Sequence, residues 1–170
     1  SLMTLMSQTA SAACGKVTIA EMNWASAGLM ANVDKIILTA LGCNAELVPG
    51  DTMPTFTSMN EKSQPDVAPE VWTNAMAIPL KKAFDEGRLH SANAAPISGL
   101  GEGWWIPPAT AKKHPDLKTV LDILKRPDLF PYAEDKSKGA FVTCPAGWGC
   151  QLTNANLFRA FEMEKKGWVL

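Results

Sequence analysis

The most constraining feature of this sequence is a strand–helix–strand pattern near its start. Val17–Met22 has the apolar content of a short buried strand, and Ala45–Val48 has it again. Between them, apolar residues recur at helical spacing from Leu29 to Leu41, and the following Gly42 is typical of a helix end. Because a strand–helix–strand unit places its strands parallel and generally adjacent, the segment predicts an α/β fold.

The alternation of helices and strands continues to residue 86. Asp51 can cap a helix over Met53–Glu61, Asp66–Ala68 has the pattern of a third short strand, and a helix is expected near Ala77–Glu86. Such alternation predicts doubly wound α/β sheets, which bind ligands at the carboxyl ends of their strands. Four candidate ligand-binding residues follow predicted strands: Asn23, Trp24, Thr52 and Trp72.

The composition changes near Gly99–Gly103, a glycine-rich stretch that precedes the apolar segment Trp104–Ile106 and two prolines. Glycines followed by an apolar strand and paired prolines are typical of a hinge. We therefore predict two α/β lobes, residues 14–103 and residues 104–170. The second lobe is expected to contain helices near 117–125 and 152–161 and a strand at 140–143.

The end of the chain resembles the start of a strand, because Gly167 is followed by Trp168, Val169 and Leu170. A lobe made only of residues 104–170 is small for a stable hydrophobic core. We therefore expect the second lobe to be truncated.

The first 13 residues and the cysteines both suggest export. Residues 1–13 are uncharged, small or apolar, and end in an Ala-x-Ala type of pattern, so we predict the remnant of a secretory signal, with a tag as the alternative. The chain has 4 cysteines, and an even number in an exported protein predicts disulfide bonds. Both features predict export to an oxidising compartment.

Two disulfide pairings follow from the predicted elements. Cys14 and Cys43 each precede one of two parallel strands, so they should meet at one sheet edge. Cys144 and Cys150 would close a short loop with two flexible glycines. No Cys-x-x-Cys pair exists and both histidines lie far from the cysteines in sequence, so we expect no metal site and no cofactor.

The charge balance excludes two classes of partner. Lys plus Arg number 16 and Asp plus Glu number 17, for a net charge of -1. A nucleic-acid binder usually has a basic excess, and so does a protein that binds an anionic membrane surface. No stretch approaches the roughly 20 consecutive apolar residues that span a bilayer.

The positions of the 6 tryptophans suggest a site for a methylated ammonium ion. Such an ion has few or no hydrogen-bond donors, but aromatic faces attract it. Trp24 and Trp72 follow predicted strands, and Trp148 lies in the glycine loop of the second lobe. Trp105 is a further candidate, because neighbours on a strand point to opposite faces and only one of Trp104 and Trp105 can face a cleft. Trp168 is expected to be a core residue.

The loop between Cys144 and Cys150 leads directly into a predicted helix. Backbone N–H groups at a helix start point outward and attract anions. The N–H groups of Gly149 and Cys150 are therefore candidate donors to a ligand carboxylate. A disulfide would hold the loop rigid before binding and so lower the entropy cost of ordering it.

These stretches resemble a known family. The loop Cys-Pro-Ala-Gly-Trp-Gly-Cys at 144–150 is similar to the motif of the periplasmic glycine betaine/proline betaine-binding proteins of ABC transporters. Glu21–Trp24, Val48–Thr55, Asp66–Trp72 and Gly103–Pro107 also look like that family.

The resemblance implies a two-lobed, type II periplasmic-binding-protein fold and no enzymatic activity. It implies Trp72 and Trp148 as walls of an aromatic cage, and Gly149 and Cys150 as carboxylate donors. The implied partners are a small quaternary-ammonium ligand, such as glycine betaine, proline betaine or a choline-like compound, and the membrane subunits of an ABC transporter. Met76 departs from the family pattern, because some members have a histidine donor there.

Two other functions fit parts of the sequence. A thiol hydrolase could use Cys150 with a histidine. A binding protein for a sugar or another polar solute could use tryptophan faces together with polar side chains. Such side chains are available at Asn23, Asn74 and Gln151.

Overall fold

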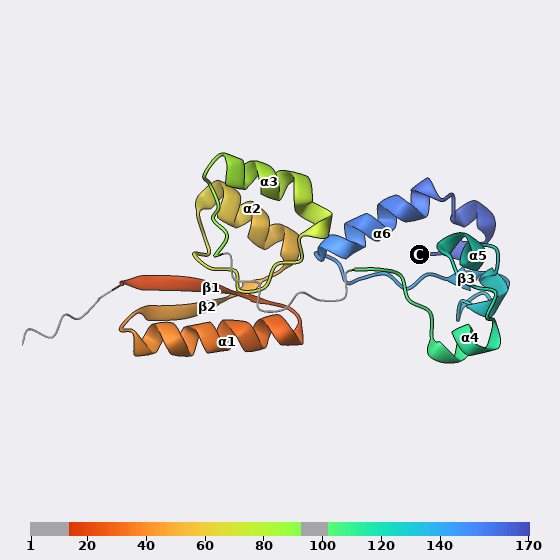
Figure 1. Ribbon diagram of the computed structural model, residues 1–170, viewed down its shortest axis with the longest axis horizontal. Helices are drawn as coiled ribbons and strands as arrows, with labels where there is room; N and C mark the ends of the chain where they lie inside the picture. Colours follow the sequence, from red (N-terminus) through yellow and green to blue (C-terminus); the bar gives the residue numbers. More distant parts are fainter. Residues whose placement is uncertain (1–13, 93–101) are drawn as a thin grey trace, which may run out of the picture. The chain divides into compact units, whose positions relative to one another are not determined.

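The computed structural model describes residues 14–92 and 102–170, which form two compact units (Figure 1). The first unit runs to Trp72 and includes Lys81–His90; the second comprises Thr73–Leu80 and the residues from Ser91 to Leu170. This division assigns Thr73–Leu80 to the second unit, whereas the predicted lobe boundary lies after residue 103. The predicted signal remnant at 1–13 and hinge glycines Gly99 and Gly101 lie outside the described residues.

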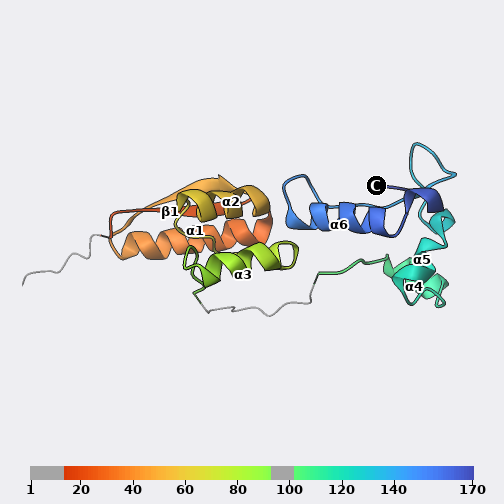
Figure 2. The ribbon, with the colours of Figure 1, turned by 90° about the horizontal axis from the view of Figure 1, so that it is seen from above.

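The first unit is built on a parallel strand pair, as predicted. Strand β1 (Lys16–Met22) pairs with β2 (Asn44–Gly50), with Ile19 opposite Leu47. Helix α1 (Ala25–Ala40) connects them and ends before Gly42, which adopts a left-handed φ of 89° that favours glycine. Figures 1 and 2 show the two strands lying along α1.

The third predicted strand is reduced to one bridge. Val67 lies opposite Ile19 in parallel, and Val67 O accepts from Ala20 N–H at 2.8 Å. Helix α2 (Thr52–Lys62) follows β2, and Asp51 Oδ1 accepts from Thr52 N–H at 2.8 Å, which confirms the predicted cap. Figure 1 shows α1 and α2 on opposite sides of the strands.

Small residues make the first core compact. Ile19, Ala31 and Ala45 form one buried cluster, and a second consists of Ala20, Met22 and Ala27. Alanines on α1 and on both strands let the helix lie close to the sheet. The Cys14–Cys43 disulfide, with a Cα–Cα distance of 5.0 Å, joins the residues that precede β1 and β2 and confirms that pairing.

Asp66 bonds the segment that contains Val67 to β1, and it makes part of the stability of the fold depend on pH. Its Oδ2 accepts from Thr18 Oγ1 at 2.6 Å and from Thr18 N–H at 2.7 Å, and these bonds lower the pKa of Asp66 below its ordinary 3.8. A lowered folded-state pKa adds stability above the ordinary value, and this is lost as the pH falls through the folded value. Acid denaturation followed by circular dichroism should therefore show a shallower loss of stability below about pH 5 in Asp66→Asn than in the unmodified chain. Equal slopes would contradict this assignment.

The second unit has short elements around an aromatic core. Strand β3 (Gly139–Ala140) pairs in parallel with β4 (Trp168–Val169), and α6 (Gly149–Ala160) is its longest helix (Figures 1 and 2). The remaining helical elements are α3 (Ala77–Asp85), shared between the units, α4 (Pro108–Lys113), α5 (Val120–Leu124), and the 3-10 turns η1 (Asn74–Met76), η2 (Pro127–Leu129) and η3 (Glu164–Lys166).

Two strand predictions in the second unit are wrong in part or in full. The strand expected at 140–143 pairs only at Ala140, and Trp104–Ile106 forms no ladder. Pro107 and Pro108 lack the N–H group that a ladder needs, and Pro108 instead begins α4. The predicted helix at 152–161 begins earlier, at Gly149.

Aromatic rings form the core of the second unit. Trp168 is 3% exposed, packs with Leu124 and Met163, and donates from Nε1 to Leu124 O at 3.0 Å. Its ring centroid lies 5.6 Å from that of Phe130, and the Trp104 centroid lies 4.5 Å from that of Phe141. The prediction that Trp168 belongs to the core is confirmed.

The fold class is α/β. The described residues contain two parallel sheets of two strands each, so the doubly wound sheets stay a prediction. Across the described ranges, no helix combines the length and apolarity needed to cross a membrane.

Candidate functional site

The loops after β1 and β2 meet at the strand ends. Asn23 Nδ2 donates to Asp51 Oδ2 at 3.4 Å, and both side chains are accessible. Thr52 is only 5% exposed and begins α2, so its side chain lies mainly inside the first unit. Of the strand-end candidates, Asn23 and Trp24 are thus more accessible than Thr52.

A single carboxylate joins two of the candidate tryptophans. Glu70 Oε1 accepts from Trp24 Nε1 at 2.7 Å and from Trp72 Nε1 at 2.9 Å. The same oxygen accepts from Ser26 Oγ at 3.0 Å. Trp72 remains 47% exposed. The first unit therefore presents two indoles whose nitrogens share one anionic acceptor.

The disulfide loop of the second unit lies at a helix start. Cys144 and Cys150 are bonded with a Cα–Cα distance of 5.9 Å, which confirms the second pairing. Trp148 is the N-cap residue of α6, and Gly149 and Cys150 are its first two residues. Because Gly149 and Cys150 lie in the first turn, their N–H groups have no carbonyl acceptor within α6. This is the arrangement expected of donors to an anion.

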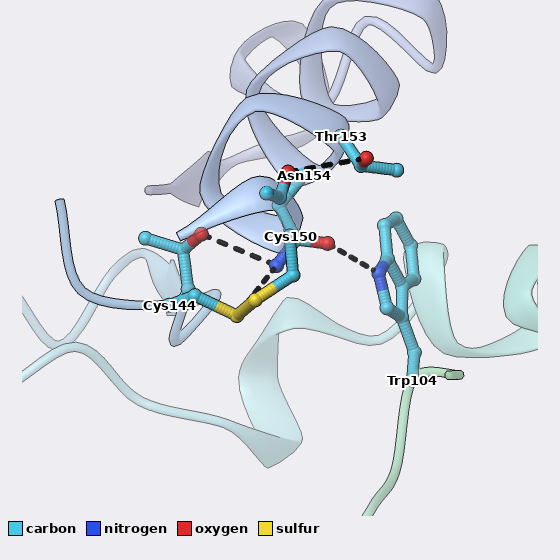
Figure 3. The surroundings of a disulfide bond; sticks show 7 residues. Trp104, Cys144, Cys150, Thr153 and Asn154 are labelled. Atoms are coloured by element: carbon cyan, nitrogen blue, oxygen red, sulfur yellow. Dashed lines mark hydrogen bonds between the residues drawn. A yellow bond between two sulfur atoms is a disulfide. The ribbon is translucent and has the colours of Figure 1, made fainter. Parts of the chain in front are cut away.

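Asn154 holds this loop against the second core (Figure 3). Its Oδ1 accepts from Trp104 Nε1 at 2.9 Å. Its Nδ2 donates to Thr143 Oγ1 at 3.2 Å and lies 4.0 Å from Cys144 Sγ. One side chain on α6 thus links the core tryptophan to the segment that enters the disulfide loop.

Replacing Asn154 with alanine should loosen the loop. The change leaves the indole N–H of Trp104 and the hydroxyl of Thr143 without their partner, at a cost of about 1–3 kcal/mol if each stays buried. We expect faster reduction of Cys144–Cys150 by dithiothreitol, with an unchanged rate for Cys14–Cys43, measured by alkylation and mass spectrometry. Asn156→Ala, at an exposed position on the same helix, is the matched control. Equal reduction rates in both variants would contradict the prediction.

The remaining candidates lie at different depths. Trp105 is 75% exposed, whereas Trp104 packs in the second core, so the two rings do occupy different environments. Met76 is 0% exposed in η1, which packs against α6. A thioether at that position supplies no hydrogen-bond donor to a carboxylate.

The structure groups the predicted site residues within each unit. Trp24 and Trp72 meet at Glu70 in the first, and Trp148, Gly149 and Cys150 are consecutive in the second. Sequence reasoning missed Glu70 and Asn154. Glu70 could have been found as the one carboxylate in the loop after the third predicted strand, two residues before Trp72.

The chemistry of the cysteines argues against a thiol enzyme. All 4 cysteines lie in described segments and all are disulfide-bonded, so no thiolate nucleophile is present. Among the residues the structure describes, no three His, Cys, Asp or Glu side chains gather as metal ligands.

Accessible indoles and helix-start N–H groups are features of a ligand-binding site, here in a protein of the α/β class. A comparison with family models identifies it further. Residues 15–169 match the model described as the substrate binding domain of ABC-type glycine betaine transport system, and the chain belongs to this family. No curated protein matches the sequence.

Family membership establishes the coarse features. The fold is of the type II periplasmic-binding class, and the role is substrate binding for an ABC transporter of glycine betaine-type ligands. The family consists of binding proteins rather than enzymes, and its members are extracytoplasmic. These statements agree with the resemblance noted in the sequence.

Proposed function

We propose that this chain captures glycine betaine, or a related quaternary-ammonium osmolyte, through tryptophan faces and helix-start amides. The observation that carries the proposal is the disulfide loop, in which Trp148 caps α6 and is followed at once by Gly149 and Cys150. An aromatic face and two backbone donors are therefore consecutive in the chain. Glycine betaine has the two matching groups, a trimethylammonium and a carboxylate.

The aromatic part of the site recognises the ammonium group. A methylated cation over an indole face is attracted by about 0.5–2 kcal/mol for each ring, and more strongly where water is excluded. Trp72 is well exposed in the first unit, and Trp24 is bonded to the same carboxylate. Trp72 and Trp148 are the proposed cage walls, and Trp24, Trp105, Asn23 and Thr52 are proposed to contribute around them.

The amide part of the site recognises the carboxylate. Gly149 and Cys150 occupy the first turn of a helix of 12 residues, where the N–H groups and the helix dipole favour an anion. The disulfide and Asn154 hold this turn in place before binding. Preorganisation of this kind lowers the entropy cost of capture.

The proposal includes a delivery step. The loaded protein would pass its ligand to the membrane subunits of an ABC transporter, in the bacterial periplasm. The two predicted α/β lobes, 14–103 and 104–170, with doubly wound sheets, are part of this proposal, as is their closure about a hinge.

Tryptophan fluorescence titration of the whole chain tests the proposed function. Glycine betaine, proline betaine and choline should change the emission at low concentration, and maltose should not. Maltose tests the alternative of a sugar site, because sugars also stack on indoles. Equal responses to all four compounds, or no response to any ammonium compound, would exclude the proposal.

A further inference from the structure

The carboxylate that joins Trp24 and Trp72 has an unusual set of partners. Glu70 Oε1 accepts three hydrogen bonds, all from neutral donors: two indole N–H groups and the hydroxyl of Ser26. An indole Nε1 can only donate a hydrogen bond, so in both contacts the tryptophan is the donor and Glu70 is the acceptor. Hydrogen bonds to an ionised acceptor are stronger than those between neutral groups. Glu70 therefore fixes the orientation of both rings.

The shared acceptor also limits the distance between the two indole nitrogens. The two indole nitrogens cannot lie farther apart than the sum of 2.7 and 2.9 Å, because each is bonded to the same oxygen. Trp24 is itself placed by the N-terminus of α1, where it is the N-cap residue. Through Glu70, the loop that carries Trp72 is therefore attached to the N-terminus of α1.

In the part of the chain that the structure describes, Glu70 is not part of an ion pair. Within residues 14–92 and 102–170, the ion pairs involve other acidic residues, and no Lys or Arg pairs with Glu70. The indoles and the hydroxyl solvate the carboxylate without neutralising it. A negative charge thus lies beside two aromatic rings, one of which is 47% exposed.

We propose that Glu70 both positions Trp24 and Trp72 as one aromatic wall and biases that wall toward ligands with a net positive charge. The second part rests on the proposed function, because it concerns the ligands of the same site. A choline-like cation is attracted by the uncompensated carboxylate. A zwitterion gains less, because its own carboxylate is repelled.

The positioning role is tested without any ligand. Two-dimensional ¹H–¹⁵N spectra of the whole chain resolve indole N–H groups, which single Trp→Phe variants assign. In Glu70→Ala, the signals of Trp24 and Trp72 should both move upfield as their acceptor is lost. The Trp168 signal should stay, because its acceptor is Leu124 O in the other unit. If the signals of Trp24, Trp72 and Trp168 all keep their chemical shifts, the proposal that Glu70 positions the two rings is overturned.

The selectivity role is tested by calorimetric titration with choline and with glycine betaine. Glu70→Gln keeps the shape and an acceptor oxygen but removes the charge. The ratio of the choline Kd to the glycine betaine Kd should rise about three- to tenfold in this variant. Glu46→Gln makes the same change in net charge at an exposed ion pair with Lys16 and should leave the ratio unchanged.

The outcomes separate this inference from the proposed function. If the unmodified chain binds neither compound, the proposed function is contradicted, and so is the selectivity role. The indole chemical shifts would still test the positioning role. An unmodified chain that binds both, with equal ratios in Glu70→Gln and Glu46→Gln, would overturn the selectivity role alone.

Discussion

Replacing Trp148 with alanine is expected to weaken glycine betaine binding by about 30-fold. A desolvated cation–π contact contributes about 2 kcal/mol, which corresponds to that factor. Trp148 precedes Gly149 and Cys150 directly, so the substitution removes the ring next to the proposed carboxylate donors. Isothermal titration calorimetry measures the effect without depending on the emission of the residue removed.

Trp148→Phe is the matched control for this prediction. A phenyl ring keeps an aromatic face of smaller size, so the variant should recover most of the affinity that alanine loses. Retention of full affinity by the alanine variant would remove Trp148 from the proposed cage. Equal losses in both variants would contradict the prediction, because the phenyl face would then contribute no measurable attraction for the cation.

Replacing Trp168 with alanine should produce the largest loss of stability in the second unit, about 3–5 kcal/mol. The ring is 3% exposed, packs with Leu124 and Met163, and lies against the ring of Phe130 in a tilted arrangement. Its removal leaves a cavity and takes away the donor to Leu124 O. Urea denaturation followed by circular dichroism should show a lower midpoint.

Trp105→Ala is the matched control, because the same substitution is made at a ring that is 75% exposed. Its effect on the free energy of unfolding should stay within about 0.5 kcal/mol. Similar midpoints for the two variants would contradict the assignment of Trp168 to the core. The pair also separates stability from binding, since Trp105 is a proposed ligand contact.

The first unit could be predicted closely from the sequence because its signals are local. The apolar run of β1, the helical spacing in α1 and the capping residue Asp51 each act over a few positions. The parallel pairing and the Cys14–Cys43 bond then followed from chain connectivity. The third strand was over-predicted, since only Val67 bridges to β1, and the remaining bonds join the backbone and side chain of this short segment to Thr18 alone.

The second unit was harder to predict because its secondary structure depends on contacts between residues far apart in the sequence. Trp104–Ile106 has the composition of a strand, but the Trp104 ring packs on Phe141 and the prolines that follow prevent pairing. Strands β3 and β4 are two residues each, too short for a periodic pattern. Their position depends on residues far apart in sequence.

The candidate site, too, could be predicted only in part from the sequence. The disulfide loop carried a short, specific motif, so Trp148, Gly149 and Cys150 could be proposed from sequence. The roles of Glu70 and Asn154 were missed, because each also bonds to a tryptophan far away in the sequence, Trp24 at 46 positions and Trp104 at 50 positions. Such contacts leave no periodicity in a single sequence.

The two cross-links make stability depend on the compartment in which the chain folds. They enclose separate loops, with sequence separations of 29 and 6. Chain-entropy arguments assign about 3.6 kcal/mol to the longer loop and about 2.3 kcal/mol to the shorter one. Together, about 6 kcal/mol is comparable with the whole free energy of folding of a typical domain. Cytosolic thiols would therefore tend to keep this polypeptide unfolded until it reaches an oxidising environment.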